Sequence, residues 1–375
     1  MTAPRPLFVD SHPTLKLQSP IEHFYGWAAL AAPAGEVKAY CDGHDLRMAR
    51  VQRPDVVRAG HANYFGFAFF LDLPGLVGDH GITSETLDIE FRGDGDVVAS
   101  FGVEVDRSLV DGARYIHANR SKKADFIADH LKVAADRIEG CVAPSALPAG
   151  WSLSPRLDEM TDAVSSHAYG PAVTAFLKGL APNAWVLDAG AGLRRWPTRN
   201  VVNMEIYDYP STDILAIGQS LPFKDDSFDA ALSLAVLEHV DDPFLCASEL
   251  MRVVKPGGKI MVIIPFLQSE HGYPSHFFNA TRFGVRKLFE KGASLERQFL
   301  DFSNHPVFTL HQILGQYAAG LQGELREAFL NAPIRTFVDN HPTKMSVDGN
   351  PFVRELSDEM RWILAAGTTS IFVKG

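Results

Sequence analysis

One stretch of the chain, residues 184–206, constrains the fold more than any other. It opens with a short apolar run of the kind that forms a buried parallel strand. Asp188 follows, and then Gly190 and Gly192, at which the backbone can approach a ligand without a Cβ in the way. A second apolar run ends in Glu205, whose carboxylate can accept both hydroxyls of a ribose. This order predicts a strand, a glycine turn and a second strand that together bind a nucleoside.

The glycine turn also has a purely structural explanation. Many strand-to-helix turns carry glycine for backbone geometry alone, and one such turn is weak evidence for a ligand. The residues downstream have to decide between the two explanations.

The composition describes a globular protein with space for two domains. The chain has 375 residues, of which 46% are hydrophobic and 21% charged, and domains usually hold roughly 100–200 residues each. The net charge of −10 and the lack of long Lys/Arg clusters argue against a nucleic-acid partner.

The three cysteines and the apolar runs predict the compartment. Cys41, Cys141 and Cys246 are far apart and lack metal-ligand spacing, which favours reduced thiols. No signal peptide is recognisable, and no apolar run approaches the ~20 residues of a membrane span. These features predict a soluble, cytoplasmic protein.

Residues 1–110 predict an all-β sandwich. Short segments rich in aromatic and β-branched residues are separated by turn residues such as Asp42-Gly43, Pro74-Gly75 and Gly93-Asp94-Gly95. The predicted strands are Phe24–Leu30, Val37–Tyr40, Tyr64–Leu73, Thr86–Arg92 and Val97–Val105.

The segments Gly26-Trp27-Ala28, Glu36–Gly43, Arg53–Val56 and Phe65-Gly66-Phe67 resemble a small β-sandwich module of bacterial glycosyltransferases and saccharide-modifying enzymes. The resemblance covers about eighty residues. It implies a glycan-binding accessory domain, and a packing or oligomerisation domain without a ligand is equally open.

Residues 111–155 predict a helical linker. Apolar residues in Lys122–Glu139 recur at helical spacing, and Ala143–Pro155 is rich in proline. Arg156–Leu180 predicts one or two further helices. The polar residues just before Gly170-Pro171 either cap a bound cofactor or cap a helix; they are Ser165, Ser166, His167 and Tyr169.

Residues 156–375 alternate strands with helices, which specifies an α/β fold with a doubly wound parallel sheet. After the opening stretch, the expected elements are strands at Asp213–Ile217, Phe228–Leu234, Lys259–Ile264 and Leu295–Phe302, and helices at Phe244–Val254, Arg282–Phe289, Thr309–Leu330 and Phe352–Ala366. A last strand, Thr369–Lys374, is expected to close the sheet edge in the antiparallel sense.

Four motifs in this part resemble class I S-adenosylmethionine-dependent methyltransferases of the broad type 11 group. They are Val186–Gly192, Leu221–Asp229 with its Leu-Pro-Phe and Ser-Phe-Asp, Val236-Leu-Glu-His239 and Arg252–Gly258. Their combination, order and spacing are more specific than any one motif. The same residues argue against an NAD-linked enzyme, because Arg194 occupies the position at which NAD-binding folds carry a third glycine.

The resemblance implies a Rossmann-like domain that binds S-adenosyl-L-methionine, and it assigns roles by position. Asp188, Gly190 and Gly192 would line the methionine part and Glu205 the ribose, with adenine flanked by residues 218–221. The full implied set is Asp188, Gly190, Ala191, Gly192, Glu205, Ile206, Gln219, Ser220, Leu221 and Ala235. His239 is expected to be structural, with contact to cofactor or substrate as the alternative.

Two departures from the resembled pattern matter. Ile217 is apolar where many relatives carry an acid for the adenine amine, and Gln219 is the candidate substitute. The excursion Leu193–Asn200 is short and carries Arg194 and Arg195, which argues against a full helix there.

The loop after Lys259–Ile264 is the place to look for acceptor chemistry. Methyl transfer to a hydroxyl needs an in-line nucleophile and a base, and neutral histidine is the usual base near pH 7. His271 and His276, with Glu270 and Tyr273 beside them, are the candidates. The alternative is that these side chains only shape a lid. No metal site is predicted.

Two functions follow from the sequence. The first is O-methylation of a saccharide or glycan-related acceptor, favoured by the cofactor motifs, the histidine loop and the sandwich resemblance. The second is a non-catalytic scaffold or binding protein that keeps the methyltransferase fold, favoured by Ile217 and the short excursion.

Overall fold

The computed structural model describes residues 7–30, 36–61, 63–138, 141–144, 165–198, 200–269, 271, 275–319, 324, 327, 330–331 and 367–374. The chain divides into two compact units. The first combines Met1–Ala168 with Ala191–Ala216, and the second combines Tyr169–Gly190 with Ile217–Gly375.

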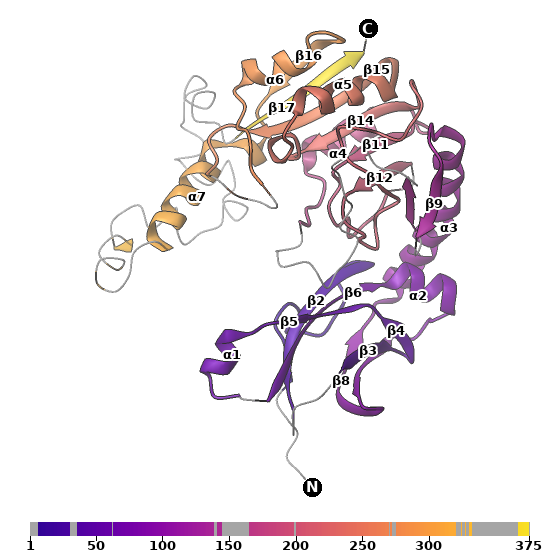
Figure 1. Ribbon diagram of the computed structural model, residues 1–375, viewed down its shortest axis with the longest axis vertical. Helices are drawn as coiled ribbons and strands as arrows, with labels where there is room; N and C mark the ends of the chain where they lie inside the picture. Colours follow the sequence, from indigo (N-terminus) through magenta and orange to yellow (C-terminus); the bar gives the residue numbers. More distant parts are fainter. Residues whose placement is uncertain are drawn as a thin grey trace. The chain divides into compact units, whose positions relative to one another are not determined.

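Two four-stranded antiparallel sheets form most of the first unit (Figure 1). One has the order β1-β2-β6-β5, with bounds Leu7–Val9, Ile21–Ala29, Tyr64–Asp72 and Met48–Val51. The other has the order β4-β3-β7-β8, with bounds His44–Leu46, Val37–Cys41, Thr86–Gly93 and Asp96–Glu104. Five of these strands match the predicted ones, whereas β1, β4 and β5 are too short to show a period in the sequence.

Of the three turns predicted in this part of the sequence, two are confirmed and one is wrong. Asp42 and Gly43 both have positive φ, 47° and 82°, as a tight hairpin between β3 and β4 requires. Asp94 and Gly95 also have positive φ, in the hairpin between β7 and β8. Pro74-Gly75 is not a turn, because it lies in helix α2 (Leu73–His80), where proline occupies the first turn and needs no amide donor.

Phenylalanine dominates the core of the first unit. Side chains from both sheets enter one buried cluster, in which the rings of Phe67 and Phe91 lie 4.6 Å apart and those of Phe24 and Phe69 lie 5.3 Å apart. Fully buried aromatic rings contribute large apolar areas, and their contacts hold the two sheets together. The prediction of an all-β domain is confirmed in its antiparallel sheets, but α1 (Pro54–Arg58) and α2 belong to the same unit.

The predicted helix Lys122–Glu139 begins and ends elsewhere. Helix α3 spans Arg107–His130, capped by Asp106, whose carboxylate accepts from the Ser108 amide. The strands β9 (Ala135–Ile138) and β10 (Cys141–Pro144) follow. They occupy residues that were predicted as the end of the helix Lys122–Glu139 and the start of the proline-rich segment Ala143–Pro155. β9 and β10 pair with each other, and the order continues through β13 (Ile214–Leu215) to β12 (Val201–Glu205).

A buried ion pair connects α3 to this second part of the unit. The Lys123 ammonium lies 2.8 Å from Asp213 Oδ2, which also accepts from the Asn203 amide. The segment 191–216 therefore groups with the N-terminal residues, although its sequence motifs belong to the predicted domain 156–375. The limits of the predicted domains, 1–110, 111–155 and 156–375, remain a prediction.

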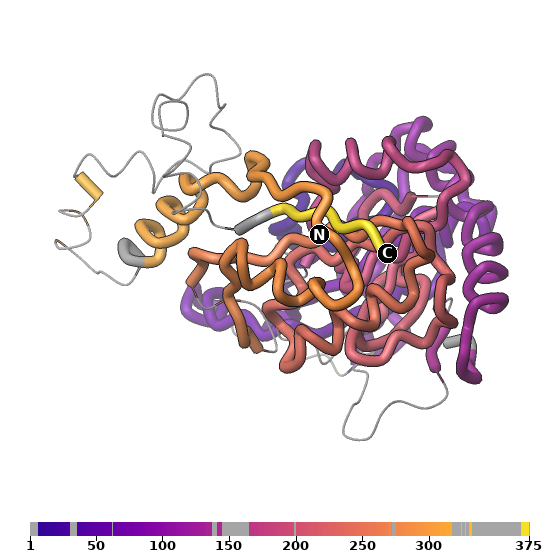
Figure 2. The backbone as a smooth tube through the Cα atoms, turned by 90° about the horizontal axis from the view of Figure 1, so that it is seen from above, coloured from indigo at the N-terminus to yellow at the C-terminus, as the bar shows by residue number. Residues whose placement is uncertain are grey.

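The described residues of the second unit form five strands in the order β16-β17-β15-β14-β11. β11 (Val186–Ala189), β14 (Phe228–Leu234) and β15 (Val254–Pro265) are parallel, as predicted from their apolar runs. β17 (Gly367–Lys374) pairs antiparallel with β15 on one side and with β16 (Ala293–Phe299) on the other. In Figure 2, β17 is the yellow segment that leads to the C-terminus. The predicted antiparallel sense is confirmed, but the last strand is inserted between two others and β16 takes the outer position.

Helices connect these strands. They are α4 (Pro171–Lys178), α5 (Pro243–Val253), α6 (Arg282–Phe289) and α7 (Pro306–Ala319), with short 3-10 turns η2 (Leu237–His239) and η3 (Phe302–Asn304). Asp242 caps α5 by accepting from the Leu245 amide. The Lys255–Gly258 segment lies in a bulge within β15, because the register changes between Phe228↔Val254 and Ala230↔Lys259.

Several expectations lie outside the described residues, including the linker after residue 144 and the helix Phe352–Ala366. Among the helices that the structure describes, none is long and apolar enough to cross a membrane.

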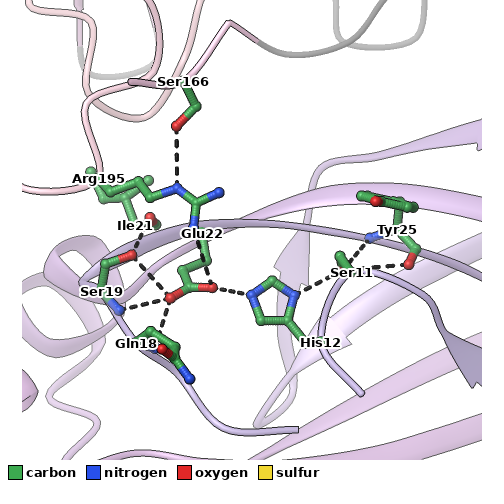
Figure 3. Close-up of polar contacts among 9 residues, drawn as sticks. All are labelled: Ser11, His12, Gln18, Ser19, Ile21, Glu22, Tyr25, Ser166 and Arg195. Atoms are coloured by element: carbon green, nitrogen blue, oxygen red, sulfur yellow. Dashed lines mark hydrogen bonds and ion pairs between the residues drawn. The ribbon is translucent and has the colours of Figure 1, made fainter. Parts of the chain in front are cut away.

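A polar network around Glu22 fixes the entry to β2 in the first unit (Figure 3). The Glu22 side chain is fully buried and accepts from the amides of Gln18 and Ser19, each at 2.7 Å. The His12 ring contacts the second carboxylate oxygen, and its Nδ1 lies 2.8 Å from the Ser11 hydroxyl.

Arg195 extends this network. Its guanidinium lies 4.0 Å from Glu22 and its Nε donates to the Ser166 hydroxyl at 3.2 Å. Burial alone would raise the pKa of Glu22, but the bonds from His12, Gln18 and Ser19 outweigh burial and lower it. The carboxylate is therefore a stabilising group only while it is charged.

Replacing Glu22 with Gln tests this network. We expect Glu22→Gln to lower the free energy of unfolding at pH 7 by about 1.5–3 kcal/mol, because charge-assisted bonds are lost. A lowered folded-state pKa gives stability above the unfolded value that disappears as the pH falls through the folded value. Urea unfolding at pH 7 and pH 3 measures the difference, with the exposed Glu36→Gln as control. An equal loss for Glu22→Gln at both pH values would contradict the charged role.

Candidate functional site

The glycine turn after β11 has left-handed backbone at both glycines. Gly190 has φ 79° and Gly192 has φ 62°. A Cβ at Gly190 would lie 2.5 Å from Val236 Cγ2, and one at Gly192 would lie 2.7 Å from the Ser165 carbonyl oxygen. Backbone geometry and packing therefore already require glycine here, so the glycines alone do not prove a ligand.

Asp188, at the end of β11, has a specific partner in the second unit. Its side chain is fully buried, and the Tyr169 hydroxyl donates to its Oδ2 at 2.6 Å. Tyr169 does not cap α4, whose N-cap is Gly170 without a side-chain bond. Of the two alternatives for the segment before α4, helix capping by Tyr169 is thus wrong.

Glu205 is held at the glycine turn of the first unit. Its Oε2 accepts from the Gly192 amide and its Oε1 from the Ile206 amide, each at 2.7 Å. The Ala191 amide donates to the Met204 carbonyl at 3.0 Å, which ties the turn to the end of β12. These hydrogen bonds fix the orientation of the Glu205 carboxylate beside the glycine turn.

The excursion after Gly192 has no helix in its described residues 191–198, as predicted. The Arg194 guanidinium donates to the His167 carbonyl oxygen at 2.6 Å. The Leu193 amide donates to the Ser165 carbonyl oxygen at 2.8 Å. These bonds connect the excursion to the polar residues 165–167 within the first unit.

The predicted adenine segment is largely buried in the second unit. Gln219 uses its side-chain amide to donate to Asp241 Oδ1 at 2.8 Å. The Leu221 amide donates to Glu249 at 2.9 Å, and the Ser220 amide donates to the Ile217 carbonyl at 3.2 Å. The side-chain amide of Gln219 therefore already has a hydrogen-bond partner within the protein.

Ala235 has a backbone conformation that non-glycine residues rarely adopt. Its φ is 56°, and its amide donates to the Ile263 carbonyl at 2.9 Å. Strained backbone at the carboxyl end of a parallel strand is common at functional sites. The strain turns the chain from β14 into η2.

Three histidines meet beyond the carboxyl ends of β14 and β15. The ring centroids of His271 and His276 lie 4.5 Å apart, and the ring of His239 lies 5.2 Å from the first and 5.6 Å from the second. The sequence predicts one group of His271 and His276 with Glu270 and Tyr273. It predicts a structural role for His239, with contact to cofactor or substrate as the alternative. The structure brings His239 into the same group. The adjacency of β14 and β15 was the signal that could have predicted this meeting.

The two predicted bases differ in their hydrogen bonds. His276 Nδ1 accepts from the His271 amide at 3.3 Å, and its Nε2 lies 3.1 Å from the Phe278 carbonyl and 3.0 Å from Asn279 Oδ1. Both nitrogens of His276 are thus occupied. His271 Nδ1 donates to the Ser269 carbonyl at 2.9 Å, which leaves Nε2 as an acceptor.

The environment keeps two of these histidines neutral. Burial lowers the pKa of His271, against a raising effect of the Ser269 carbonyl. Burial also lowers the pKa of His239, whose Nδ1 donates to the Ser275 carbonyl at 2.9 Å. A neutral ring with one bound N–H is suited to accept a proton or a cation at its other nitrogen. Glu270 and Tyr273, the other candidates in this loop, lie outside the described residues.

Glu238, which the sequence did not single out as functional, is a fully buried neighbour of this group. Its backbone carbonyl accepts from the amides of Phe277 and Phe278, at 2.7 and 3.2 Å. Neither of its carboxylate oxygens has a hydrogen-bond partner among the residues that the structure describes. Burial raises the pKa of Glu238 to about 8.

Comparison with known proteins gives one family match. Residues 175–262, from α4 into β15, match the family model described as a methyltransferase domain. Uncharacterised methyltransferases of Mycobacterium are similar over part of the chain. That of M. tuberculosis (strain ATCC 25177 / H37Ra) is 38% identical over 88 residues, which are 22% of this chain and 34% of the relative. That of M. marinum is 38% identical over 82 residues, 20% of this chain and 32% of the relative.

The chain thus spans about a third of the length of the curated relatives it matches. Among solved structures, the [4+2]-cyclase SpnF is similar with a TM-score of 0.32 and 18% identity, covering 51% of this chain and 74% of that chain. A SAM-dependent methyltransferase from Thermotoga maritima has a TM-score of 0.31 and 18% identity, covering 53% and 86%.

The buried carboxyl of Glu238 predicts a pH effect on stability. Because its folded-state pKa is raised, the folded protein keeps a proton that the unfolded chain releases above its ordinary value near 4.5. Stability therefore falls as the pH rises from about 5 to 8, by up to about 1.4 kcal/mol per pH unit. We expect Glu238→Gln to remove this slope.

Thermal unfolding from pH 5 to pH 9 in EDTA measures the slope, since EDTA removes cations that would compensate the charge. The matched control is Glu249→Gln, a half-buried glutamate that is paired with Arg252. A Glu238→Gln curve parallel to wild type would show that Glu238 is not a buried neutral acid.

Proposed function

We propose that the protein is an S-adenosylmethionine-dependent methyltransferase. The observation that carries the proposal is the position of Glu205 within the matched methyltransferase segment, where the Gly192 amide fixes its carboxylate at 2.7 Å. A carboxylate held beside a glycine turn at the end of a strand is suited to the two hydroxyls of a ribose.

The remaining cofactor contacts follow from the family resemblance. Asp188, Gly190, Ala191 and Gly192 are proposed to contact the methionine part, and Ala235 to lie beneath the cofactor. Ile206, Gln219, Ser220 and Leu221 are proposed to contact adenine and its ribose. The bound cofactor would supply an electrophilic methyl group on a sulfonium.

For the acceptor we propose a hydroxyl of a saccharide or glycan-related compound. The structural support is His271, whose ring is kept neutral by burial and whose Nε2 is the acceptor nitrogen. Such a group can take the hydroxyl proton as the oxygen attacks the methyl group. The N-terminal resemblance to modules of saccharide-modifying enzymes favours a sugar over other hydroxyl compounds.

The second function, a non-catalytic scaffold with a methyltransferase fold, is supported by the adenine segment. Ile217 is buried and apolar, and the amide group of Gln219 already bonds Asp241. A chain with these features has fewer polar groups for adenine than the resembled family implies. Cofactor binding decides between the two functions.

The first test is calorimetric titration with S-adenosylmethionine and S-adenosylhomocysteine. We expect micromolar binding of at least one, weakened at least about 100-fold in Glu205→Ala, because two charge-assisted hydrogen bonds are worth about 1.5–3 kcal/mol each. Glu104→Ala, at the exposed end of β8, is the control. No binding by wild type would favour the scaffold function.

The second test separates binding from transfer. We expect His271→Ala to bind the cofactor normally and to lower the rate of transfer by about 10²–10⁴-fold, the usual contribution of a general base. His276→Asn should have a smaller effect, since both ring nitrogens of His276 already have partners. Formation of S-adenosylhomocysteine in the presence of a panel of sugars is the readout. Full turnover by His271→Ala would show that the base is another group.

A further inference from the structure

We propose that Glu238, His239 and His271 form a binding site for a divalent transition-metal ion. One ligand atom from each of these side chains can be chosen so that all three lie within 4.8 Å of one another. The proposal concerns metal binding by the protein itself. It does not depend on cofactor binding, but it is an alternative to the role of His271 as general base, because the one Nε2 lone pair cannot bind a metal ion and accept a proton at the same time.

The two histidines are prepared as ligands by their other hydrogen bonds. His239 Nδ1 donates to the Ser275 carbonyl and His271 Nδ1 to the Ser269 carbonyl, each at 2.9 Å. Metal-binding histidines are almost always oriented in this way, because the bound N–H fixes the tautomer and presents the other nitrogen. Both rings therefore present Nε2 as a lone-pair donor.

The carboxylate of Glu238 supplies the second, independent observation. It is fully buried, and neither oxygen accepts a hydrogen bond from any residue that the structure describes. A buried acid without a partner costs free energy unless a cation or a donor compensates it. Its Oε1 lies 3.8 Å from His239 Nε2, so one cation can be bound by both groups.

The fold explains why residues from different segments converge here. β14 and β15 run parallel with Leu234 opposite Ile263, so their carboxyl ends lie at the same edge. Glu238 and His239 come from η2, which follows β14, and His271 comes from the segment after β15. The site is thus located where α/β sheets usually bind ligands.

The donor set indicates the class of metal. Two imidazoles and one carboxylate are typical of Zn²⁺, Fe²⁺ and similar ions, whereas Mg²⁺ and Ca²⁺ prefer oxygen ligands alone. Metal–nitrogen bonds of about 2.0–2.1 Å require small side-chain rotations that bring the three ligand atoms closer together. Three protein ligands leave open coordination positions for water or for an oxygen of a bound molecule.

His276 is not expected to be a ligand. Its Nδ1 accepts from the His271 amide, and its Nε2 lies near the Phe278 carbonyl and Asn279 Oδ1. It positions the backbone at His271. This distinction makes the proposal specific to three of the four neighbouring side chains.

The test is calorimetric titration of the full chain with Zn²⁺ after treatment with a chelator, repeated with Co²⁺ and followed by visible absorption. We expect one saturable site, with Glu238→Gln, His239→Ala and His271→Ala each weakening Zn²⁺ binding by more than about 100-fold. Even the hydrogen-bond partners of ligands contribute about 10–100-fold in affinity. The Co²⁺ spectrum should show nitrogen ligands in wild type and lose intensity in the histidine variants.

The control variant removes a second pair of neighbouring histidines that could bind zinc. The rings of His44 and His80 stack at 3.8 Å in the first unit, and the double variant His44→Ala/His80→Ala should leave the titration unchanged. Far-ultraviolet circular dichroism verifies that each variant is folded. His271→Ala, which changes a half-buried loop residue, is the variant least dependent on folding of the core.

Two outcomes would overturn the proposal. One is that folded wild-type protein shows no saturable Zn²⁺ or Co²⁺ binding. The other is that binding persists in His271→Ala and disappears in the His44/His80 double variant. No cofactor or acceptor is added in these titrations, so failure of the metal site and failure of the methyltransferase proposal can be distinguished.

Discussion

The parallel pairing of β11, β14 and β15 is the constraint on which the functional part of the second unit depends. The three strands pair without interruption at their carboxyl ends, with Asp188 opposite Leu232 and Leu234 opposite Ile263. Burial of their apolar side chains fixes this register, because a shift by one residue would reverse every side chain. The turn at Gly190, the strained Ala235 and the histidine loop all begin where these strands end.

The first unit relies on a different kind of constraint. Its sheets share a phenylalanine core, but the entry to β2 is fixed by the buried carboxylate of Glu22, which several donors satisfy. Glu238 in the second unit is equally buried and has no such donors among the described residues. The contrast shows that burial alone does not define the role of an acid; its partners do.

Elements marked by a continuous apolar run or by a capping residue could be predicted from the sequence, and short strands without such a run could not. The core strands β11, β12, β14 and β15 and the helix α5 follow from their patterns, and Asp242 marks the start of α5. Pro74-Gly75 was wrongly interpreted because the same dipeptide can begin a helix as well as a turn. At the site, residues on one segment were grouped correctly. His239 and Glu238 were missed as partners of His271 because only the sheet brings them together.

The insertion of β17 has a consequence for synthesis of the protein. Residues 367–374 pair with β15 on one side and β16 on the other, so β15 and β16 have no shared neighbour until that segment exists. During translation the edge of β15 that faces β17 therefore has unpaired amides and carbonyls while the residues between Pro265 and Gly367 are made. The sheet can be completed only after residues 367–374 have been made and have left the ribosome.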